Sequence, residues 1–249
     1  MKVALVLSGG AIRGVAHIGV IKALEDLGFE ISAISGVSAG ALVGAFYCAG
    51  YTPEDMLKIV KSKHWLRYIK PRLPKLGFFS LMDAKRFLKD YLEVERIEEL
   101  KREFHICALD ILSGNTLYFS EGELYEPLLG SCALPGIFEP VKFKNFLLLD
   151  GGITNNLPVE PVQNKGLFIV GVDVNPTSTI GKPRSLFAVL IRSFLLAVRS
   201  NADKRKELCN VVIVPDLEDY SPYNLWKLEE LYHLGYKKTL EVMKEFHGQ

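Results

Sequence analysis

The chain has 249 residues, a formal net charge of +1 and 49% hydrophobic residues. This length suits one large α/β domain, and no shift in composition marks a second one, so we expect a single domain over residues 1–249. The nearly balanced charge argues against a nucleic-acid-binding protein, and no apolar run reaches the roughly 18 residues that a membrane span needs.

The cysteines and the N-terminus indicate a reducing compartment. The N-terminal stretch carries charged residues and lacks the pattern of a cleaved signal peptide. The four cysteines lie in apolar contexts, without the spacing of a metal site or a redox motif: Cys48, Cys107, Cys132 and Cys209. We therefore expect buried thiols and a cytoplasmic location.

The first predicted unit is a strand, a glycine-rich loop and a helix. The apolar run Val3–Leu7 predicts a strand in the middle of a parallel sheet. The loop spans residues 8–14, and the helix after it ends at Gly28. One face of this helix carries His17, Val20, Ile21, Leu24 and Leu27.

The glycine-rich loop permits three interpretations. Its backbone N–H groups at Gly10 and Ala11, with Gly9 shaping the turn, could stabilise the oxyanion of an acyl-transfer intermediate. Gly9, Ala11 and Gly14 also match a degenerate dinucleotide-binding fingerprint, with Glu30 near the position of a ribose ligand. The third interpretation is a tight connection without chemistry.

The second unit places a serine between a strand and a helix. The run Ile31–Ser35 predicts a strand, Gly36-Val37-Ser38-Ala39-Gly40 follows it, and residues 39–48 favour a helix. Glycines on both sides are typical of a sharp turn that exposes a nucleophilic serine, with the helix N-terminus pointing toward developing negative charge. In a parallel sheet this turn and the glycine-rich loop emerge at the same edge.

A basic, aromatic segment follows. Thr52 and Pro53 begin a helix, with Asp55 completing a capping box. Residues 56–82 contain no acid, and prolines and a glycine predict that the second half is a loop lying over the surface. This segment is a solvated basic face, a lid or contact for an anionic membrane, or a nucleic-acid contact. Its basic residues are Lys58, Lys61, Lys63, Arg67, Lys70, Arg72 and Lys75.

The middle of the chain leads to a buried aspartate. Asp83 is expected to cap a short helix, residues 105–111 and 116–119 to form a hairpin, and residues 131–140 to form a constrained loop. The apolar strand at residues 146–149 ends in Asp150-Gly151-Gly152. Asp150 is either a turn residue or, with Ser38 in place, the base that accepts the serine proton. The rival bases, His233 and His247, lie in the predicted terminal helix.

The C-terminal part supplies further buried elements. Strands are predicted at residues 168–174 and 211–214, and an amphipathic helix over residues 221–246. Residues 186–198 are apolar nearly all round, which favours a buried helix over an acyl-chain wall, a membrane contact or a dimer interface.

Four motifs, in this order, resemble those of the patatin-like phospholipase family: Gly9–Gly14, Gly36–Gly40, Ser131–Pro140, and Asp150–Gly152 with its Asn-Leu-Pro-Val continuation. The resemblance covers roughly residues 3–175. It implies a three-layer α/β/α fold with a mostly parallel, doubly wound central sheet. It also implies hydrolysis of fatty acyl esters of phospholipids or related lipids, without a metal or a cofactor.

Carried over by position, the resemblance makes Ser38 the nucleophile, Asp150 the general base and the loop at Gly9, Gly10 and Ala11 the oxyanion hole. Arg13 matches a basic position that ties the loop down or faces an anionic headgroup. Ala11 departs from the pattern, which often has a third glycine; an alanine held at positive φ would strain the loop.

The expected function is a lipid acyl hydrolase that uses a Ser38–Asp150 dyad. Its partner would be a lipid or acyl-ester substrate, reached in the cytoplasm or at the inner membrane surface through peripheral contact. The alternatives are a catalytically weak lipid-binding or regulatory protein on the same fold, favoured if Ala11 spoils the hole, and a nucleotide-dependent oxidoreductase.

Overall fold

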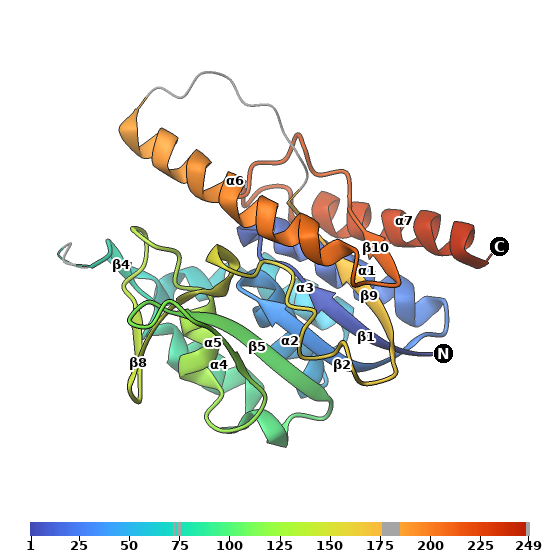
Figure 1. Ribbon diagram of the computed structural model, residues 1–249, viewed down its shortest axis with the longest axis horizontal. Coiled ribbons are helices and arrows are strands. Elements are labelled where there is room, and N and C mark those ends of the chain that lie inside the picture. Colours follow the sequence, from blue (N-terminus) through green and yellow to red (C-terminus); the bar gives the residue numbers. More distant parts are fainter. Residues whose placement is uncertain (72, 74–75, 176–184, 248–249) are drawn as a thin grey trace.

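The computed structural model describes residues 1–71, 73, 76–175 and 185–247, and it has a central sheet with flanking helices (Figure 1). The strands follow the order β10-β9-β1-β2-β5-β8-β7, and β6 pairs with β5. The parallel strands are β1 (Lys2–Leu7), β2 (Glu30–Val37), β5 (Glu103–Asp110), β9 (Phe168–Val172) and β10 (Val211–Ile213). The predicted α/β class with a mostly parallel central sheet is confirmed.

One side of the sheet is antiparallel: the hairpin of residues 105–111 and 116–119 is present as predicted, whereas the antiparallel pairing of residues 141–150 was not predicted. There β6 (Thr116–Phe119), β7 (Val141–Phe143) and β8 (Phe146–Asp150) extend the sheet as hairpins. Short turns allow antiparallel neighbours, whereas parallel strands need long crossovers. The parallel, doubly wound part of the sheet therefore consists of β1, β2, β5, β9 and β10. Because β8 runs antiparallel to β5, Asp150 pairs with Ala108. The preceding residue of β5, Cys107, pairs with Val37 at the end of β2, so Asp150 lies level with the turn that follows β2.

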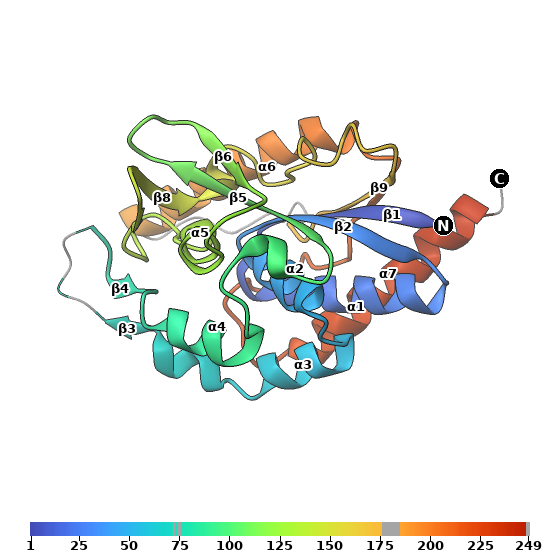
Figure 2. The ribbon, with the colours of Figure 1, turned by 90° about the horizontal axis from the view of Figure 1, so that it is seen from below.

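The helices cover the two faces unequally (Figure 2). Alternate side chains of β1 pack on opposite faces: Leu5 joins the larger core and Val6 the smaller one. The smaller core is covered by residues 157–162 and by α6 (Leu186–Lys206), which carries Ala202. The larger core is covered by α1 (Val15–Asp26), α2 (Ala39–Ala49), α3 (Pro53–Lys61), α4 (Ala84–Leu92), α5 (Tyr125–Ser131) and α7 (Leu228–His247).

Helix α7 begins later than predicted and packs very closely on α1. Residues 221–227 form turns, because the side chains of Ser221 and Asn224 accept hydrogen bonds from the N–H groups of Tyr223 (3.3 Å) and Trp226 (2.9 Å). A Cβ atom at Gly235 would lie 2.0 Å from the carbonyl oxygen of Ala16, so only glycine permits this approach.

Of the N-caps predicted for α3 and α4, the first is confirmed and the second is wrong. At α3, Thr52 Oγ1 accepts a hydrogen bond from Asp55 N (3.2 Å), with Pro53 at the first helical position, as predicted. At α4, Asp83 occupies the N-cap position in helical conformation and makes no capping hydrogen bond, so the predicted cap is wrong. Its carboxylate instead lies 3.5 Å from Lys70 Nζ, because the chain before α4 folds back beside it.

Short regular elements interrupt the basic segment at residues 56–82, whose second half was predicted to be a loop. It contains a 3₁₀ helix, His64–Tyr68, and an antiparallel pair, β3 (Lys70–Pro71) with β4 (Phe79–Ser80). Arg72, Pro74 and Lys75 of the predicted loop lie outside the described residues.

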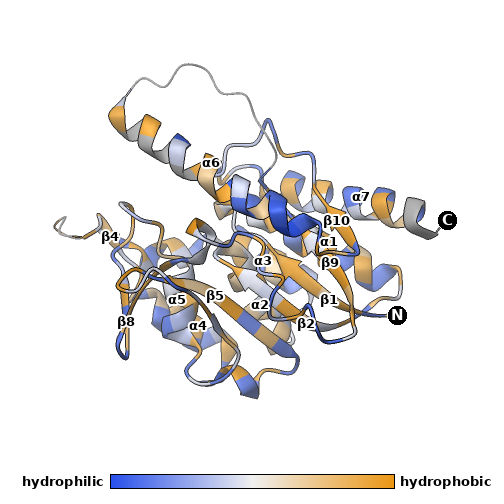
Figure 3. Ribbon diagram, viewed as in Figure 1, coloured by the Kyte–Doolittle hydropathy of each residue, from blue (hydrophilic) through white to orange (hydrophobic). Residues whose placement is uncertain are grey.

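The predicted burial of residues 186–198 is wrong for most of the side chains that are described. Leu186, Val189 and Leu196 are exposed, and Val198 is buried. The reason is packing: the C-terminal half of α6 lies on the sheet, and its N-terminal half extends beyond it (Figure 1). Figure 3 shows a hydrophobic sheet and a hydrophilic C-terminal end of α6. Within the described part of the chain, no helix is long and apolar enough to cross a membrane.

Candidate active site

Ser38 occupies a strained turn between β2 and α2. Its backbone angles are φ 55° and ψ −124°, a region that L-residues rarely adopt. A Cβ atom at Gly36 would lie 2.7 Å from Gly40 O, and one at Gly40 would lie 2.4 Å from Leu7 O. The two glycines are thus required by backbone contacts on either side of the serine, and the predicted sharp turn is present.

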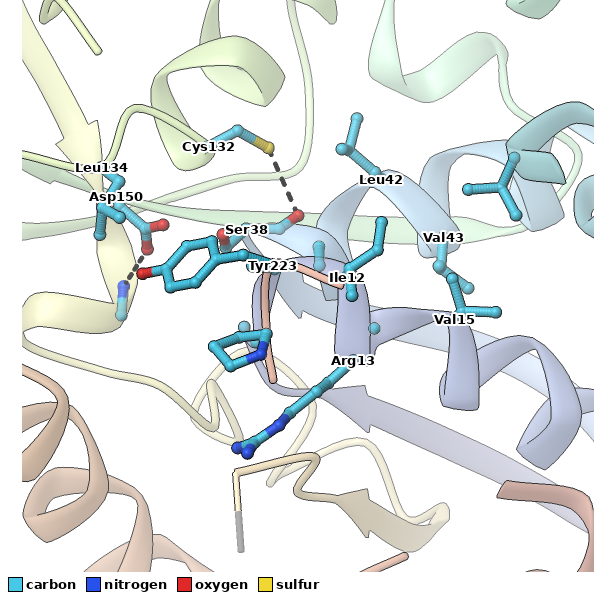
Figure 4. A pocket seen from close by; sticks show the side chains of 18 of the residues that line it. Ile12, Arg13, Val15, Ser38, Leu42, Val43, Cys132, Leu134, Asp150 and Tyr223 are labelled. Carbon is cyan, nitrogen blue, oxygen red and sulfur yellow. Dashed lines mark hydrogen bonds between the residues drawn. The ribbon is translucent and has the colours of Figure 1, made fainter. Parts of the chain in front are cut away.

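Ser131 holds the backbone of this turn. Its hydroxyl accepts a hydrogen bond from Ser38 N (2.8 Å) and donates one to Cys107 O in β5 (2.6 Å). The Cys132 thiol donates to Ser38 O (3.4 Å), as Figure 4 shows. The loop at residues 131–140 therefore begins at the nucleophile turn, where the sequence predicted only a constrained loop near a site.

Asp150 lies at the end of β8 and is 6% exposed. Gly152 N donates a hydrogen bond to Asp150 Oδ1 (2.8 Å), and the Ser38 hydroxyl approaches the carboxylate (Figure 4). Burial raises the pKa of Asp150 to about 6, while the hydrogen bonds from Ser38 and Gly152 act in the opposite direction. The carboxylate is consequently ionised at neutral pH and more basic than an exposed aspartate.

The glycine-rich loop lies directly against Ser38. A Cβ atom at Gly9 would lie 3.0 Å from Ser38 Cβ. Gly9 N donates to Asn156 Oδ1 (3.1 Å), so this N–H group is already used. Among the described residues, the N–H groups of Gly10 and Ala11 have no hydrogen-bond partner, and both residues line the cavity that contains Ser38.

Ala11 has a positive φ, the backbone conformation in which an alanine was expected to strain the glycine-rich loop. Its φ is 50°, which glycine adopts without steric cost. We expect Ala11→Gly to raise the free energy of unfolding by about 1 kcal/mol, because relief of this strain exceeds the added freedom of the unfolded chain. Urea unfolding checks this value. A loss of stability would mean that the alanine methyl group contributes packing that outweighs the strain.

Arg13 anchors the loop. It is buried, and its Nε donates to Tyr220 O (2.6 Å). Burial lowers the pKa of Arg13, and the charges of Glu218 and Tyr223 oppose this shift. Ile12 N also donates to Pro222 O (3.0 Å). Of the two roles considered for Arg13, these contacts correspond to tying the loop down.

Three asparagines connect the loop, the aspartate turn and α6. Asn201 Nδ2 donates to Gly152 O (2.9 Å) and Ile153 O (3.1 Å), and its Oδ1 accepts from Asn156 N (2.7 Å). Asn156 Oδ1 accepts a hydrogen bond from Gly9 N, and Asn175 Nδ2 donates one to Gly9 O. The sequence analysis missed Asn201 and Asn175, because a single asparagine in a helix or after a strand carries no motif.

Ser38 and Asp150 line a cavity of about 940 Å³. Its walls come from α2, α3, α4, α6, the 131–140 loop and the turns at residues 220–225, and most of them are apolar. Pockets of roughly 300–1,000 Å³ with few polar groups are typical of small-molecule sites. Apolar wall residues from three helices include Leu42, Val43, Phe46, Met56, Phe87 and Leu88.

Of the two rival bases, His233 does not line this cavity. His233 is exposed on α7, and the side chain of His247 lies outside the described residues. His17 is fully buried, its Nε2 donates to Ser8 O (2.8 Å), and burial lowers its pKa to about 4. Burial and the charge of Asp150 raise the pKa of the Cys132 thiol well above its ordinary value, which keeps it neutral.

No group of three or more histidine, cysteine, aspartate or glutamate side chains that could hold a metal ion occurs among the described residues. The fold and the site together define an α/β protein with a nucleophile-elbow serine, a buried carboxylate beside it and a glycine-rich loop at the same sheet edge. The family model of the patatin-like phospholipases matches residues 5–162, and the chain belongs to this family. The family predicted from the four motifs is thereby confirmed.

Relatives and a solved structure are similar over different extents. An uncharacterized NTE family protein of Mycobacterium tuberculosis is 35% identical over 65% of this chain and 45% of its own length. Lysophospholipase nte1 of Aspergillus fumigatus is 26% identical over 97% of this chain and 18% of its own length. The chain thus spans less than half the length of these relatives. VipD of Legionella pneumophila has a TM-score of 0.59 and 14% identity, covering 98% of this chain and 67% of VipD, which shows a shared fold.

Proposed function

We propose that this protein is a serine lipid acyl hydrolase that cleaves fatty acyl esters of phospholipids or lysophospholipids. The observation that carries the proposal is the buried Asp150 carboxylate beside the Ser38 hydroxyl, at the wall of a large apolar cavity. Membership in the patatin-like phospholipase family and the likeness to a lysophospholipase support the choice of a lipid ester as substrate.

In the proposed mechanism Asp150 accepts the proton of Ser38 while the serine Oγ attacks the ester carbonyl carbon. The free N–H groups of Gly10 and Ala11 stabilise the oxyanion, with Gly9 shaping the turn. Asp150 then returns its proton to the departing alcohol, which leaves an acyl group on Ser38. Asp150 next takes a proton from a water molecule that attacks the acyl carbon, and returns this proton to Ser38 Oγ as the fatty acid leaves.

The pH dependence of the rate tests the role of Asp150. Only the ionised carboxylate accepts a proton, so kcat/KM should rise about tenfold per pH unit in acid and level off above the pKa of Asp150, about 6. An ordinary exposed aspartate would place this transition near pH 4. We would measure hydrolysis of a medium-chain p-nitrophenyl ester from pH 4 to 9 with a chelator present. A plateau that extends down to pH 4 would contradict the assignment.

A second candidate is a catalytically weak lipid-binding or regulatory protein, which the positive φ of Ala11 favours. A strained loop would hold the two N–H donors less well. The two candidates differ in ester turnover that depends on Ser38: the hydrolase has it, and a binding protein retains lipid affinity without it.

We further propose that the protein meets its lipid substrate at a membrane surface through peripheral contact, on the cytoplasmic side. The large apolar cavity and the basic, aromatic segment at residues 56–82 support this placement. The nucleic-acid alternative for that segment gains no support, since the segment supplies walls of the cavity instead.

A further inference from the structure

Exposed apolar side chains occur on three segments that each contribute residues to the cavity wall. We call them the rim surface: Leu66, Leu73, Leu76, Phe78 and Met82 before α4, Leu186, Val189 and Leu196 on α6, and Tyr223 and Trp226 before α7. Leu73 is 87% exposed, Leu76 66% and Phe78 53%. Proteins that work as isolated monomers rarely expose so many large apolar side chains together, so this surface calls for a partner.

The rim surface is continuous with the cavity. Leu66, Leu196 and Tyr223 are both exposed and part of the cavity wall, so they mark its opening. The β3–β4 segment and the N-terminal end of α6 lie at the same end of the molecule in two perpendicular views (Figures 1 and 2).

Backbone hydrogen bonds tie Phe78 and β4 to the loop at residues 131–140. The N–H groups of Phe78 and Phe79 donate to Ile137 O (2.9 and 3.0 Å), and Glu139 N donates to Phe79 O (2.9 Å). The Ile137 and Phe138 side chains line the cavity. A partner seated on the exposed side of this segment would therefore lie beside the cavity opening.

Two long stretches of sequence that contribute to the rim surface carry basic residues and no acidic ones. Neither residues 56–82 nor residues 174–202 contain an aspartate or a glutamate. Lys61 and Lys70 pair with Glu229 and Asp83 from neighbouring elements. Arg67 is exposed beside Leu66, and Lys63 Nζ lies 3.7 Å from the centre of the Trp226 ring. Apolar side chains flanked by cations and an aromatic ring match the interface of an anionic bilayer.

We propose that the rim surface docks on an anionic phospholipid bilayer, with Leu73, Leu76 and Phe78 entering the acyl region and Arg67 meeting the headgroups. The proposal deepens the proposed function and rests on it: docking brings the cavity opening to the lipid surface, so an acyl chain passes from bilayer to cavity without crossing water. A second copy of this chain is the competing occupant of the same surface.

The test compares vesicle binding with soluble-ester turnover. The whole protein would be sedimented with phosphatidylcholine vesicles, with and without phosphatidylglycerol. We expect binding that requires phosphatidylglycerol and weakens in high salt. The triple variant Leu73→Ser/Leu76→Ser/Phe78→Ser should lower vesicle affinity at least about tenfold, and Arg67→Gln about fivefold. Both variants should keep turnover of the soluble p-nitrophenyl ester, since none of these residues lines the cavity.

Leu208→Ser is the matched control, because Leu208 is also exposed but lies beyond the other end of α6. It should bind vesicles like the wild type. The proposal is overturned if the wild type does not bind vesicles, if the triple variant binds as well as Leu208→Ser, or if light scattering shows a dimer that the triple variant abolishes without any vesicle binding. Vesicle binding without turnover of any ester would instead refute the proposed hydrolase and leave the docking surface standing.

Discussion

Ser38→Ala is expected to lower kcat for ester hydrolysis by about 10⁴-fold or more, because it removes the atom that attacks the carbonyl carbon. Asp150→Asn should lower kcat by about 10⁴-fold, since the amide cannot accept the serine proton. The double variant should be no slower than Ser38→Ala, because the two side chains act as one unit. Turnover of a p-nitrophenyl ester and of a lysophospholipid measures all three.

Stability measurements show whether the lower kcat of Asp150→Asn comes from the missing base or from unfolding of the protein. Burial raises the pKa of Asp150 to about 6, so the native state holds its proton more tightly than the unfolded chain does. The ionised carboxylate therefore costs stability as pH rises from about 4 to 6, by up to about 3 kcal/mol above pH 6. Asp150→Asn should then be at least as stable as the wild type at pH 8, where its activity is lost.

His233→Ala is the matched control for the base. His233 is exposed on α7 and does not line the cavity, so its removal should leave kcat unchanged. Activity that survives Asp150→Asn but disappears in His233→Ala would reject the dyad.

Asn201→Ala is expected to lower kcat by about 10²-fold and the free energy of unfolding by about 3 kcal/mol. The variant leaves Gly152 O, Ile153 O and Asn156 N without their partners in a buried region. The Gly151–Ile153 turn then holds Asp150 less well, and small displacements of a catalytic group are costly. The assay is steady-state kinetics with urea unfolding in parallel.

The pH dependence of kcat shows whether Asn201 positions Asp150 or only stabilises the fold. The Gly152 N–H group lowers the pKa of Asp150, so a displaced turn should shift the kinetic transition to a pH above that of the wild type. Asn201→Asp keeps the acceptor for Asn156 N and should be less impaired in holding Gly9 than Asn201→Ala. Ser200→Ala, an exposed neighbour on α6, is the control and should match the wild type. A destabilised Asn201→Ala with unchanged kcat and pH transition would show a structural role only.

The sequence predicted the parts of the site that depend on local rules. An apolar strand, a Gly-x-Ser-x-Gly turn and a helix can be recognised along the chain, because the strained serine needs small neighbours at fixed spacing. Asp150 was a candidate from its place at the end of a buried strand before two glycines, a pattern that fits a turn residue as well as a base. The departure from the glycine pattern at Ala11 raised strain as a consequence of positive φ, and the structure shows that φ is 50° there.

Where local rules competed with tertiary contacts, the predictions were wrong. Asp83 precedes a helix and matches a cap by residue type, yet its carboxylate lies near Lys70, which belongs to β3. The apolar residues of α6 predicted burial, but its N-terminal half extends past the sheet that would have covered it. Composition alone does not distinguish a buried apolar helix from an exposed one, since both satisfy their backbone hydrogen bonds internally.

The sequence by itself determined the α/β class and the nucleophile turn, because these follow from hydrophobic period and from glycine at crowded backbone positions. It left Asp150 as a turn residue or a base, and the family resemblance selected the base. Only the tertiary structure decided that β8 runs antiparallel to β5 and delivers Asp150 to Ser38. It also decided that Ser131 and Asn201 hold the two turns, and that Leu66, Leu196 and Tyr223 of the rim surface line the cavity. These contacts join residues far apart in the chain, and their energy depends on distance in space, which no local pattern specifies.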